Sequence, residues 1–428
     1  MTATAIALIG IIVLLVLLLL RMPVSFALML IGFGGAYYMI GLDAALQLLS
    51  ADVYRQFASY GLSVVPLFIF MGQVMFRAGT SARLYEVAYK WVGSLPGGVA
   101  ATTILASVGF AAVSGSNSAT TATMGSVALP EMKRYRYDPG LSGGSVAIGG
   151  TLGVIIPPST ALIIVAVQTG QSIASLFVAA LIPGLILGAL LVATVLLVCW
   201  RRPYLGPPGP KVGWTERIRS LGAVTETLLL FAFVIGGLYL GWFTPTEAGA
   251  VGAFGALVVA VARRSLPVRE LWLAIQESLR LSAMVLLLVT GAIIFGRFLT
   301  LTRLPFQLAD WASNLPAAPI LVLLLVIAIY LVGGAVMDAL GFLVISIPIF
   351  FPLAESLGFD PIWFTIIITL VTTLGAVTPP VGVNVYIVSA LDRTMEVQRI
   401  FKGVSLFFVG YAVALAIFIM FPGIIVTG

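Results

Sequence analysis

The sequence lacks histidine, has a single cysteine and carries few charges. Of its 428 residues, 9% are charged and 61% are hydrophobic, and the mean hydropathy is +1.15. An average soluble domain has about 25% charged residues. Twenty-two Lys and Arg residues with 16 Asp and Glu residues are too few to cover a chain of this size in water. The composition therefore predicts an all-α polytopic membrane protein.

The missing residue types also exclude most catalytic and metal sites. Without histidine there is no Ser-His-Asp triad, no imidazole base and no histidine metal ligand. The lone Cys199 lies in an apolar run, which excludes an internal disulfide and a cysteine-based zinc or iron–sulfur site. The candidate functional segments described below hold no paired carboxylates for acid–base chemistry. We therefore expect that the chain is not an enzyme and has no organic cofactor.

Long apolar runs are abundant. A membrane-spanning helix needs about 20 mostly apolar residues, and ten runs are close to this length or exceed it. They are residues 4–20, 24–41, 62–78, 141–168, 175–200, 224–241, 245–262, 281–299, 362–389 and 404–426. The first run lacks a preceding basic segment and a clear small-residue cleavage site, so we interpret it as a helix and not as a signal peptide.

Two further apolar runs, 97–131 and 317–352, are interrupted near their middle. The first is broken by Ser-Gly-Ser-Asn at 114–117, and the second by Gly333-Gly334 followed by Asp338. Each is too short for two crossings with a loop, and basic residues flank the first on both sides. We predict re-entrant hairpins, because non-helical backbone at membrane depth is tolerated only where it is buried in protein or lines a cavity.

The basic residues predict the topology. A net charge of +6 and a pI near 9.5 could indicate a nucleic-acid partner. If the N-terminus is outside and ten crossings and two hairpins follow, 19 of the 22 Lys and Arg residues are cytoplasmic and only Arg55, Arg297 and Arg303 are outside. Lys and Arg are enriched in cytoplasmic loops. The charge therefore indicates a membrane topology with both termini periplasmic, and no nucleic-acid partner.

The two halves of the chain resemble each other at an offset of 222 residues. Asp138-Pro139 coincides with Asp360-Pro361, and TLGVIIPP at 151–158 coincides with TLGAVTPP at 373–380. Chance alignment of two apolar, Gly- and Pro-rich halves is the alternative. We predict repeat 1 over 1–200, a Pro-rich basic cytoplasmic linker over 201–222, and repeat 2 over 223–428. Five crossings in each repeat invert the second one, a pattern typical of secondary transporters.

The double proline in each repeat predicts free carbonyls inside the membrane. Proline lacks an N–H and leaves the carbonyl four residues earlier without its donor. The affected carbonyls are those of Gly153, Val154, Gly375 and Ala376. Unwound carbonyls coordinate Na⁺ in secondary transporters. Threonines that could add hydroxyl ligands stand nearby, at Thr151, Thr372, Thr373 and Thr378.

The hairpin tips add further oxygen ligands. Residues 113–125 concentrate hydroxyls, and Asp338 is the only carboxylate deep in the second hairpin. An ionisable residue at membrane depth is a functional hypothesis by default. Alternatives are an N-cap role for Asp338, helix packing through the small residues of 113–125, and a helix-start role for Glu247. Helix N-termini favour anions, so position alone suggests an anionic substrate near Ser118, Thr120, Thr160, Thr378 and Asn384.

Four segments together carry a family resemblance. GSNSATTATMGSVALPEM at 115–132, GGTLGVIIPPS at 149–159, FTPTEAGAVGA at 243–253 and TLGAVTPPVGVNVY at 373–386 closely resemble the large membrane subunit of TRAP (tripartite ATP-independent periplasmic) transporters. The resemblance covers essentially the whole chain. It implies the ion-transporter superfamily architecture, with a scaffold and a transport domain that moves as an elevator.

The resemblance also implies partners and an energy source. The expected partners are a small four-helix membrane subunit, separate from this chain, and a periplasmic substrate-binding protein. The chain itself is expected in the bacterial inner membrane. Two or more coupled Na⁺ ions would drive the import of an organic acid such as a C4-dicarboxylate, sialic acid or another sugar acid. Alternatives are a stand-alone sodium/anion symporter of the same superfamily, an ion channel, which the matched helix breaks disfavour, and an intramembrane enzyme.

The resemblance further implies two sodium sites, each built from a hairpin tip and a helix break. The first set comprises Ser114, Ser116, Asn117, Gly153, Ile156 and Pro158. The second set comprises Gly334, Asp338, Thr373, Gly375, Thr378 and Pro380.

Overall fold

The protein is helical throughout the part of the chain that the structure describes. The computed structural model describes residues 2–314 and 319–426, which form α-helices joined by short connections and contain no strand. The all-α prediction is therefore confirmed for these residues. Residues 317 and 318 of the predicted second hairpin lie outside the described residues, as do residue 1 of the predicted repeat 1 and residues 427 and 428 of the predicted repeat 2.

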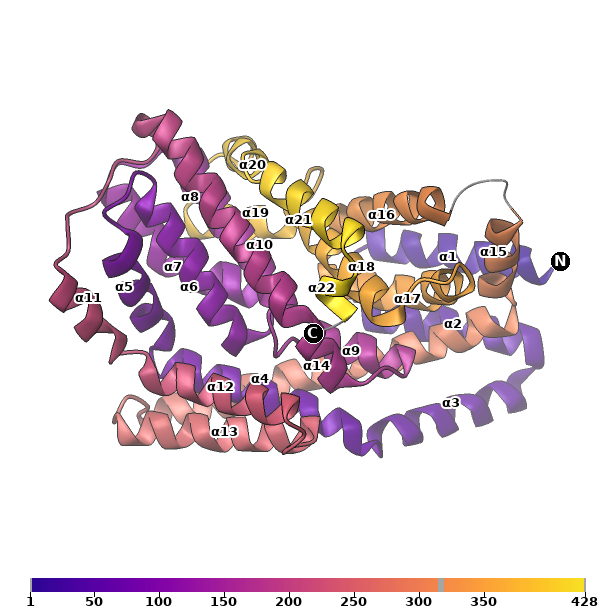
Figure 1. The fold of residues 1–428 in the computed structure, drawn as a ribbon. Helices are drawn as coiled ribbons and strands as arrows, with labels where there is room; N and C mark the ends of the chain where they lie inside the picture. Colours follow the sequence, from indigo (N-terminus) through magenta and orange to yellow (C-terminus); the bar gives the residue numbers. More distant parts are fainter. Residues whose placement is uncertain (1, 315–318, 427–428) are drawn as a thin grey trace.

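The helices of the first half precede the linker (Figure 1). They are α1 (Ala3–Leu19), α2 (Val24–Ile40), α3 (Leu42–Phe57), α4 (Val64–Arg77), α5 (Thr80–Val92), α6 (Gly98–Ser114), α7 (Asn117–Arg134), α8 (Pro139–Ile155), α9 (Thr160–Thr169) and α10 (Ile173–Arg201). Two short 3-10 helices, η1 (Tyr60–Ser63) and η2 (Pro203–Leu205), complete this part.

The second half has a corresponding order. Its helices are α11 (Trp214–Leu221), α12 (Thr225–Tyr239), α13 (Pro245–Ala262), α14 (Val268–Leu301), α15 (Leu304–Ser313), α16 (Pro319–Val336), α17 (Ala339–Ser356), α18 (Pro361–Gly375), α19 (Val383–Leu391), α20 (Val397–Ser405), α21 (Phe408–Met420) and α22 (Gly423–Val426). Both ends of α17 lie 222 residues after those of α7, and α18 begins 222 residues after α8. Helix bounds thus follow the offset seen in the sequence, while the inverted orientation of the halves stays a prediction.

Matching caps explain why equivalent helices begin at equivalent residues. The Asp138 carboxylate accepts the Leu141 amide at 3.0 Å, and the Asp360 carboxylate accepts the Trp363 amide at 2.8 Å. In each case proline is the first helical residue, where its missing N–H costs nothing. The repeated Asp-Pro pair is therefore a helix-start signal.

Several element bounds differ from the predicted spans. The predicted span 281–299 is the end of the 34-residue α14, and the linker 201–222 contains η2 and α11. The predicted span 404–426 is divided among three helices, and α20 and α21 meet at a bend of 44°. The predicted span was shorter than α14 because the prediction counted only apolar runs, and α14 continues through charged residues.

Six described helices are long and apolar enough to cross a membrane, and nine spans result if each bent helix pair counts as one. The ten predicted crossings exceed this count. Two of them, α1 and α2, have 17 residues each and fall just below the length of the other candidates. The polytopic character of the chain is confirmed at this level.

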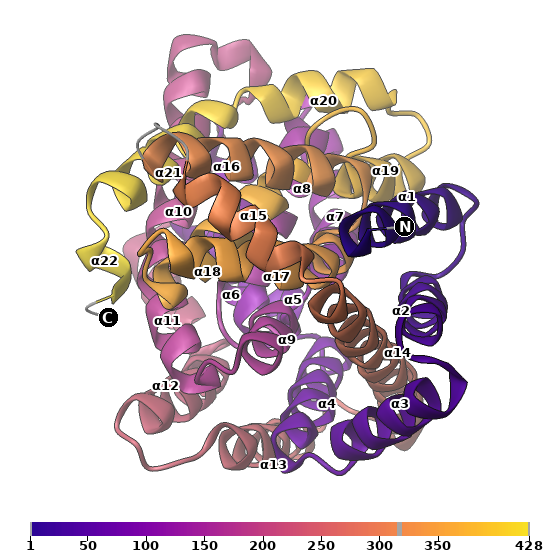
Figure 2. The same ribbon diagram turned by 90° about the vertical axis from the view of Figure 1, so that its right-hand side faces the viewer.

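The helices form two groups (Figures 1 and 2). In one group α14 packs against α2 and α4, and α13 packs against α4 and α12. In the other group α8 is surrounded by α6, α7, α19 and α20, and α18 packs against α16 and α17. The predicted hairpins and broken helices all lie in this second group.

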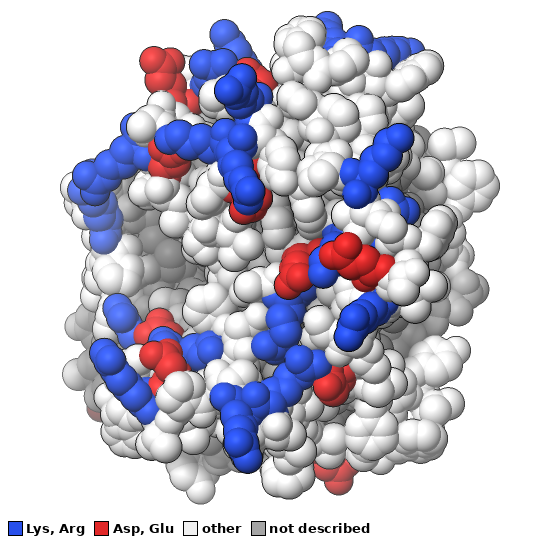
Figure 3. All heavy atoms as spheres, turned by 90° about the vertical axis from the view of Figure 1, so that its left-hand side faces the viewer, with Lys and Arg blue, Asp and Glu red and all other residues white. Residues whose placement is uncertain are grey.

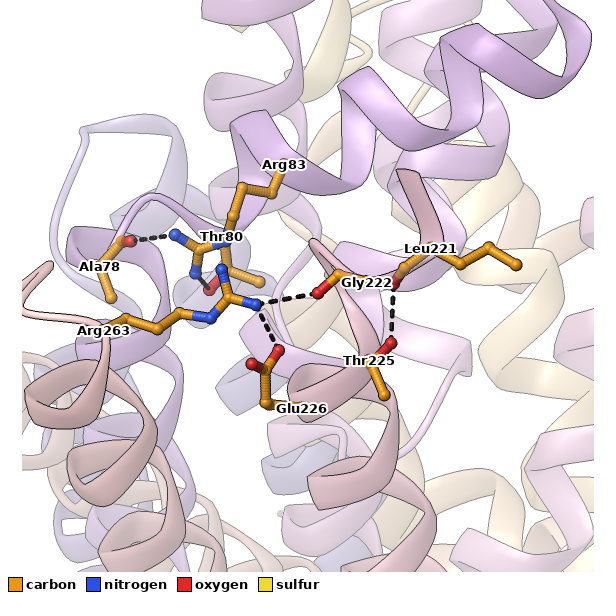
Figure 4. Close-up of polar contacts among 8 residues, drawn as sticks. All are labelled: Ala78, Thr80, Arg83, Leu221, Gly222, Thr225, Glu226 and Arg263. Carbon is orange, nitrogen blue, oxygen red and sulfur yellow. Dashed lines mark hydrogen bonds and ion pairs between the residues drawn. The ribbon is translucent and has the colours of Figure 1, made fainter. Parts of the chain in front are cut away.

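Lys and Arg side chains gather on the face that carries α5 and α11 (Figure 3). The sequence prediction assigns this face to the cytoplasmic side, and that orientation stays a prediction. At this face Arg263, the C-cap of α13, donates to the Gly222 carbonyl at 3.1 Å and forms an ion pair with Glu226 of α12 (Figure 4). Arg83 of α5 points toward the same cluster and donates to the Ala78 carbonyl at 2.8 Å. The end of the linker is thereby attached to the first group of helices.

Candidate functional site

The first hairpin turns at a polar tip between α6 and α7. Ser114 ends α6, and Gly115 has a φ of +58°, a left-handed conformation that suits glycine. Ser116 is the N-cap of α7, and its hydroxyl accepts the Ala119 amide at 3.4 Å. The interruption that the sequence shows at 114–117 is therefore a tight helix-to-helix turn.

Hydroxyl groups bind one another within this tip. The Ser114 and Thr120 hydroxyls share a hydrogen bond of 2.6 Å, and the Thr120 hydroxyl donates to the Ser116 carbonyl at 2.7 Å. Thr120 is fully buried, whereas Ser114 and Ser116 are partly exposed. The tip is thus a preformed cluster of oxygen atoms.

This tip packs directly on the break between α8 and α9. The amide and hydroxyl of Thr160 donate to the Gly115 carbonyl at 3.2 and 2.9 Å. A Cβ added to Gly153 would lie 2.4 Å from the Ser116 carbonyl oxygen, and one added to Gly115 would lie 2.6 Å from the Pro158 carbonyl oxygen. The structure therefore brings together the tip and break residues of the first predicted sodium site. Ile156, in the same break, is buried.

The second hairpin packs on the second break in a related way. A Cβ on Gly334 would lie 2.3 Å from the Thr372 carbonyl oxygen. The amides of Val381 and Gly382 donate to the Ala335 carbonyl at 3.1 and 3.0 Å. Asp338 is the N-cap of α17, and its carboxylate accepts the Leu340 amide at 3.1 Å. The capping alternative for Asp338 is therefore confirmed.

The second break differs from the sequence expectation. It spans 376–382, against 156–159 in the first repeat. The Gly375 carbonyl accepts the Thr378 amide at 2.7 Å, and the Ala376 carbonyl accepts the Asn384 amide at 3.2 Å. The prediction that these two carbonyls are left without donors is wrong, because the longer break lets later amides turn back to them. Each oxygen keeps a second lone pair.

The threonines of this break also bond to the backbone. Thr373 donates its hydroxyl to the Leu370 carbonyl at 2.8 Å, and Thr378 donates to the Leu374 carbonyl at 2.7 Å. Thr373 is fully buried, Thr378 is partly exposed and Pro380 is exposed. A hydroxyl that donates to a carbonyl can still accept, so both oxygens are available as cation ligands.

A pair of asparagines joins the two halves of the chain. The Asn384 amide group donates to the Asn117 side-chain oxygen at 2.6 Å and to the Ala147 carbonyl at 2.9 Å. Both asparagines are buried. The structure therefore places Asn384 behind the first tip, where it supports Asn117.

A cavity of about 560 Å³ lies beside the first tip. The second group of helices, which holds both hairpins, is called the hairpin group below. The polar residues that it contributes to the cavity lining are Ser114, Ser116, Asn117, Ser118, Thr160 and Asp338. Across the cavity stand Gln73 and Arg77 from α4 and Glu277 from α14, with Phe76, Phe110 and Leu281 among the apolar lining residues. The two hairpin tips therefore meet at one cavity, and the first group of helices closes its other side.

The oxygen donors present fit Na⁺ better than a transition metal. Among the described residues there is no cluster of three His, Cys, Asp or Glu side chains that could hold a metal ion. Hydroxyls, backbone carbonyls and one carboxylate converge instead at the tips and breaks. Unwound backbone carbonyls of this kind coordinate Na⁺ in secondary transporters.

Comparisons with known proteins identify the family. The family described as "Tripartite ATP-independent periplasmic transporter, DctM component" matches residues 11–424. The chain belongs to this family. It is 36% identical to the C4-dicarboxylate TRAP transporter large permease protein DctM of Pseudomonas aeruginosa, over 82% of this chain and 84% of that protein. It is also 31% identical to the 2,3-diketo-L-gulonate TRAP transporter large permease protein YiaN of Escherichia coli, over 95% of this chain and 94% of that protein.

A third TRAP relative agrees with this assignment, and two solved structures share the fold. The sialic acid TRAP transporter large permease protein SiaM of Vibrio cholerae is 30% identical, over 94% of this chain and 93% of that protein. The Alcanivorax borkumensis YdaH transporter has a TM-score of 0.63 at 14% identity, covering 90% of each chain. Neisseria gonorrhoeae MtrF has a TM-score of 0.54 at 12% identity, covering 97% of this chain and 95% of that one. The chain is thus a TRAP large permease component and not an enzyme, and the solved structures share its fold.

In this TRAP permease the sequence prediction missed the far wall of the cavity. Gln73, Arg77 and Glu277 were not among the candidates, because Arg77 was counted only as a cytoplasmic charge at a helix end. Polar residues within or at the ends of otherwise apolar helices were the available signal. Only packing of α4 and α14 against the hairpin group turns them toward the tips.

Proposed function

We propose that this chain is the transporting subunit of a sodium-driven importer of organic acids, and that a periplasmic binding protein delivers the substrate. Two hairpin tips packed on two helix breaks, with a cavity between the tips and the first group of helices, support this proposal most strongly. The substrate class follows from relatives whose names specify C4-dicarboxylate, sialic acid and 2,3-diketo-L-gulonate. The remaining partner is a small four-helix membrane subunit.

Two or more Na⁺ ions are transported together with the substrate. The first ion is bound by Ser114, Ser116 and Asn117 with Gly153, Ile156 and Pro158. The second is bound by Gly334 and Asp338 with Thr373, Gly375, Thr378 and Pro380. The substrate anion lies near Ser118 and Thr160, and the buried Thr120 and Asn384 hold the first tip in place behind it. Each bound ion stabilises the packed tip, which couples ion binding to substrate binding.

The chain lies in the bacterial inner membrane as two inverted repeats with both termini periplasmic. The hairpin group moves as an elevator against the group formed by α2, α4, α12, α13 and α14. The separation of the helices into two packed groups, with the cavity at their boundary, supports this motion. A rigid-body shift of this kind exposes the same site to either side of the membrane.

Uptake by proteoliposomes tests the proposal. The chain and its small subunit are reconstituted, and the binding protein is added outside with labelled succinate, N-acetylneuraminate or 2,3-diketo-L-gulonate. We expect uptake of at least one acid under an inward Na⁺ gradient, and loss of uptake when K⁺ replaces Na⁺. Uptake that persists without Na⁺ would contradict the sodium coupling. Uptake without the binding protein would favour a stand-alone symporter.

A matched pair of variants locates the ion site. Ser116→Ala removes a tip hydroxyl, whereas Ser126→Ala removes a hydroxyl of the same helix that donates to the Thr123 carbonyl at 2.8 Å and does not line the cavity. We expect the first variant alone to raise the Na⁺ concentration needed for half-maximal uptake. Equal Na⁺ dependence in both variants would remove Ser116 from the proposed site.

A further inference from the structure

The wall opposite the hairpin tips carries a basic side chain. Arg77 is the last residue of α4 and, among the described residues that line the cavity, the one Lys or Arg. Glu277 and Asp338 are the acidic residues of the same lining. An organic acid in this cavity therefore has one positively charged side chain within the lining to approach.

Only part of the Arg77 guanidinium group is bound within the protein. Its Nη1 donates to Glu270 Oε2 at 2.8 Å, and its Nε is buried without a hydrogen-bond partner among the described residues. Arginine presents five N–H donors in a fork that matches a carboxylate with two parallel bonds. A one-ended contact with Glu270 leaves donors of this fork unsatisfied, which is unfavourable for a charged group.

The partner of Arg77 is the more exposed member of the pair. The side chain of Glu270 is 38% exposed and that of Arg77 is 20% exposed. Ion pairs with an exposed member contribute little to stability. Water can therefore solvate Glu270 readily, and a second carboxylate can take its place at the guanidinium group without leaving a buried charge unpaired.

Arg77 and the hairpin tips belong to different groups of helices. α4 packs against α13 and α14, whereas Ser118 and Thr160 belong to the hairpin group. The cavity is lined from both sides, with Phe76 and Phe110 contributing apolar surface. A carboxylate that leaves the tip can therefore reach Arg77 without leaving the cavity.

We propose that Arg77 binds a carboxylate of the transported acid at the α4 side of the cavity, and that the acid displaces Glu270 from the guanidinium group. This assignment rests on the proposed function and adds a specificity-determining residue from the helix group that carries no ion site. Glu270 competes with the substrate for Arg77. Removing Glu270 therefore strengthens substrate binding, and removing Arg77 weakens it.

Opposite effects of the two substitutions distinguish this role from a structural ion pair. We measure equilibrium binding of labelled succinate, N-acetylneuraminate and 2,3-diketo-L-gulonate to the purified chain with its small subunit in NaCl. Arg77→Gln should raise the Kd of the bound acid about tenfold or more, since hydrogen bonds to charged groups are the stronger class. Glu270→Gln should lower it, and Arg77→Lys should give an intermediate Kd because lysine keeps the charge but not the fork.

The control is a second arginine–carboxylate pair. Arg399 and Asp138 are 2.9 Å apart and do not line the cavity, so Arg399→Gln should leave the Kd unchanged. Thermal unfolding of each variant verifies that the protein is folded. Equal losses of affinity in Arg77→Gln and Glu270→Gln would overturn the assignment of Arg77, and so would an unchanged Kd in Arg77→Gln. The proposed function would still stand in either case if the wild-type protein takes up the acid. A wild-type chain that binds none of the three acids would overturn both.

Discussion

Replacing Gly153 by alanine is the sharpest test of the packed first tip. The added Cβ would lie 2.4 Å from the Ser116 carbonyl oxygen and 2.5 Å from the Thr120 hydroxyl, whereas ordinary contact begins at 3.4 Å. The difference between 2.4 and 3.4 Å is 1.0 Å. The tip must therefore retreat by about 1 Å from the break, since α8 is buried and cannot move away.

The expected magnitude follows from the cost of overpacking. Forcing an extra carbon into a well-packed interior costs about 1–3 kcal/mol. That energy corresponds to a change of roughly 5- to 150-fold in an equilibrium constant. The retreat also stretches the two Thr160 bonds to the Gly115 carbonyl. Because the bound ion must draw the displaced tip back, we expect the apparent Na⁺ affinity to fall about tenfold or more.

Sodium-dependent thermal stability measures this change. The unfolding temperature of the detergent-purified variant is recorded against NaCl concentration, with KCl added to keep the ionic strength constant. Gly236→Ala in α12 is the control, because a Cβ there has no neighbouring atom within 4 Å. A Gly153→Ala protein with the wild-type NaCl midpoint and wild-type uptake would refute the argument that the tip and break form one ion site.

Substitutions at three further positions test other parts of the structure. Asp338→Asn should keep the α17 cap but abolish most Na⁺-dependent uptake. Asp338→Ala should in addition lower the stability measured by thermal unfolding by about 1 kcal/mol, because the cap is lost. Full uptake in both variants would exclude the carboxylate as an ion ligand. Asn384→Ala removes bonds to Asn117 and Ala147 and should lower stability by about 1–3 kcal/mol and weaken Na⁺ binding, checked by the same NaCl titration. Arg297→Gln leaves the 6% exposed Asp52 carboxylate unpaired and should lower the unfolding temperature without changing the NaCl midpoint.

Much of this architecture could be predicted from the sequence, because the position of a membrane helix depends on residues close together in the chain. Apolar length, the Asp-Pro starts and the double prolines each depend on a few neighbouring residues. The matched helix bounds of α7 and α17 followed from the same 222-residue offset. Prediction failed where charged residues lengthen a helix beyond its apolar run, as in α14, and where a break turns back on itself, as at 376–382.

The candidate site was predictable only in part. The tip residues Ser114, Ser116 and Ser118 were found because hydroxyls are conspicuous in an apolar run. Arg77 and Gln73 were not found, because nothing local distinguishes a charge at a membrane surface from a charge beside a cavity. Their role depends on a neighbour about two hundred residues away in sequence, α14, which packs against α4.

The sequence by itself determined that this is a helical membrane protein, where several of its helices start and break, and which segments resemble each other. These properties follow from the lipid environment. Each segment that crosses the membrane must be long and apolar, and its backbone N–H and C=O groups must be hydrogen-bonded within the protein. Tertiary structure alone decided that Thr160 binds the Gly115 carbonyl, that Asn384 supports Asn117 across the two halves, and that Arg77 lines the same cavity as the hairpin tips. Each of these contacts joins residues from different helices, and only the packing of whole helices brings them within bonding distance.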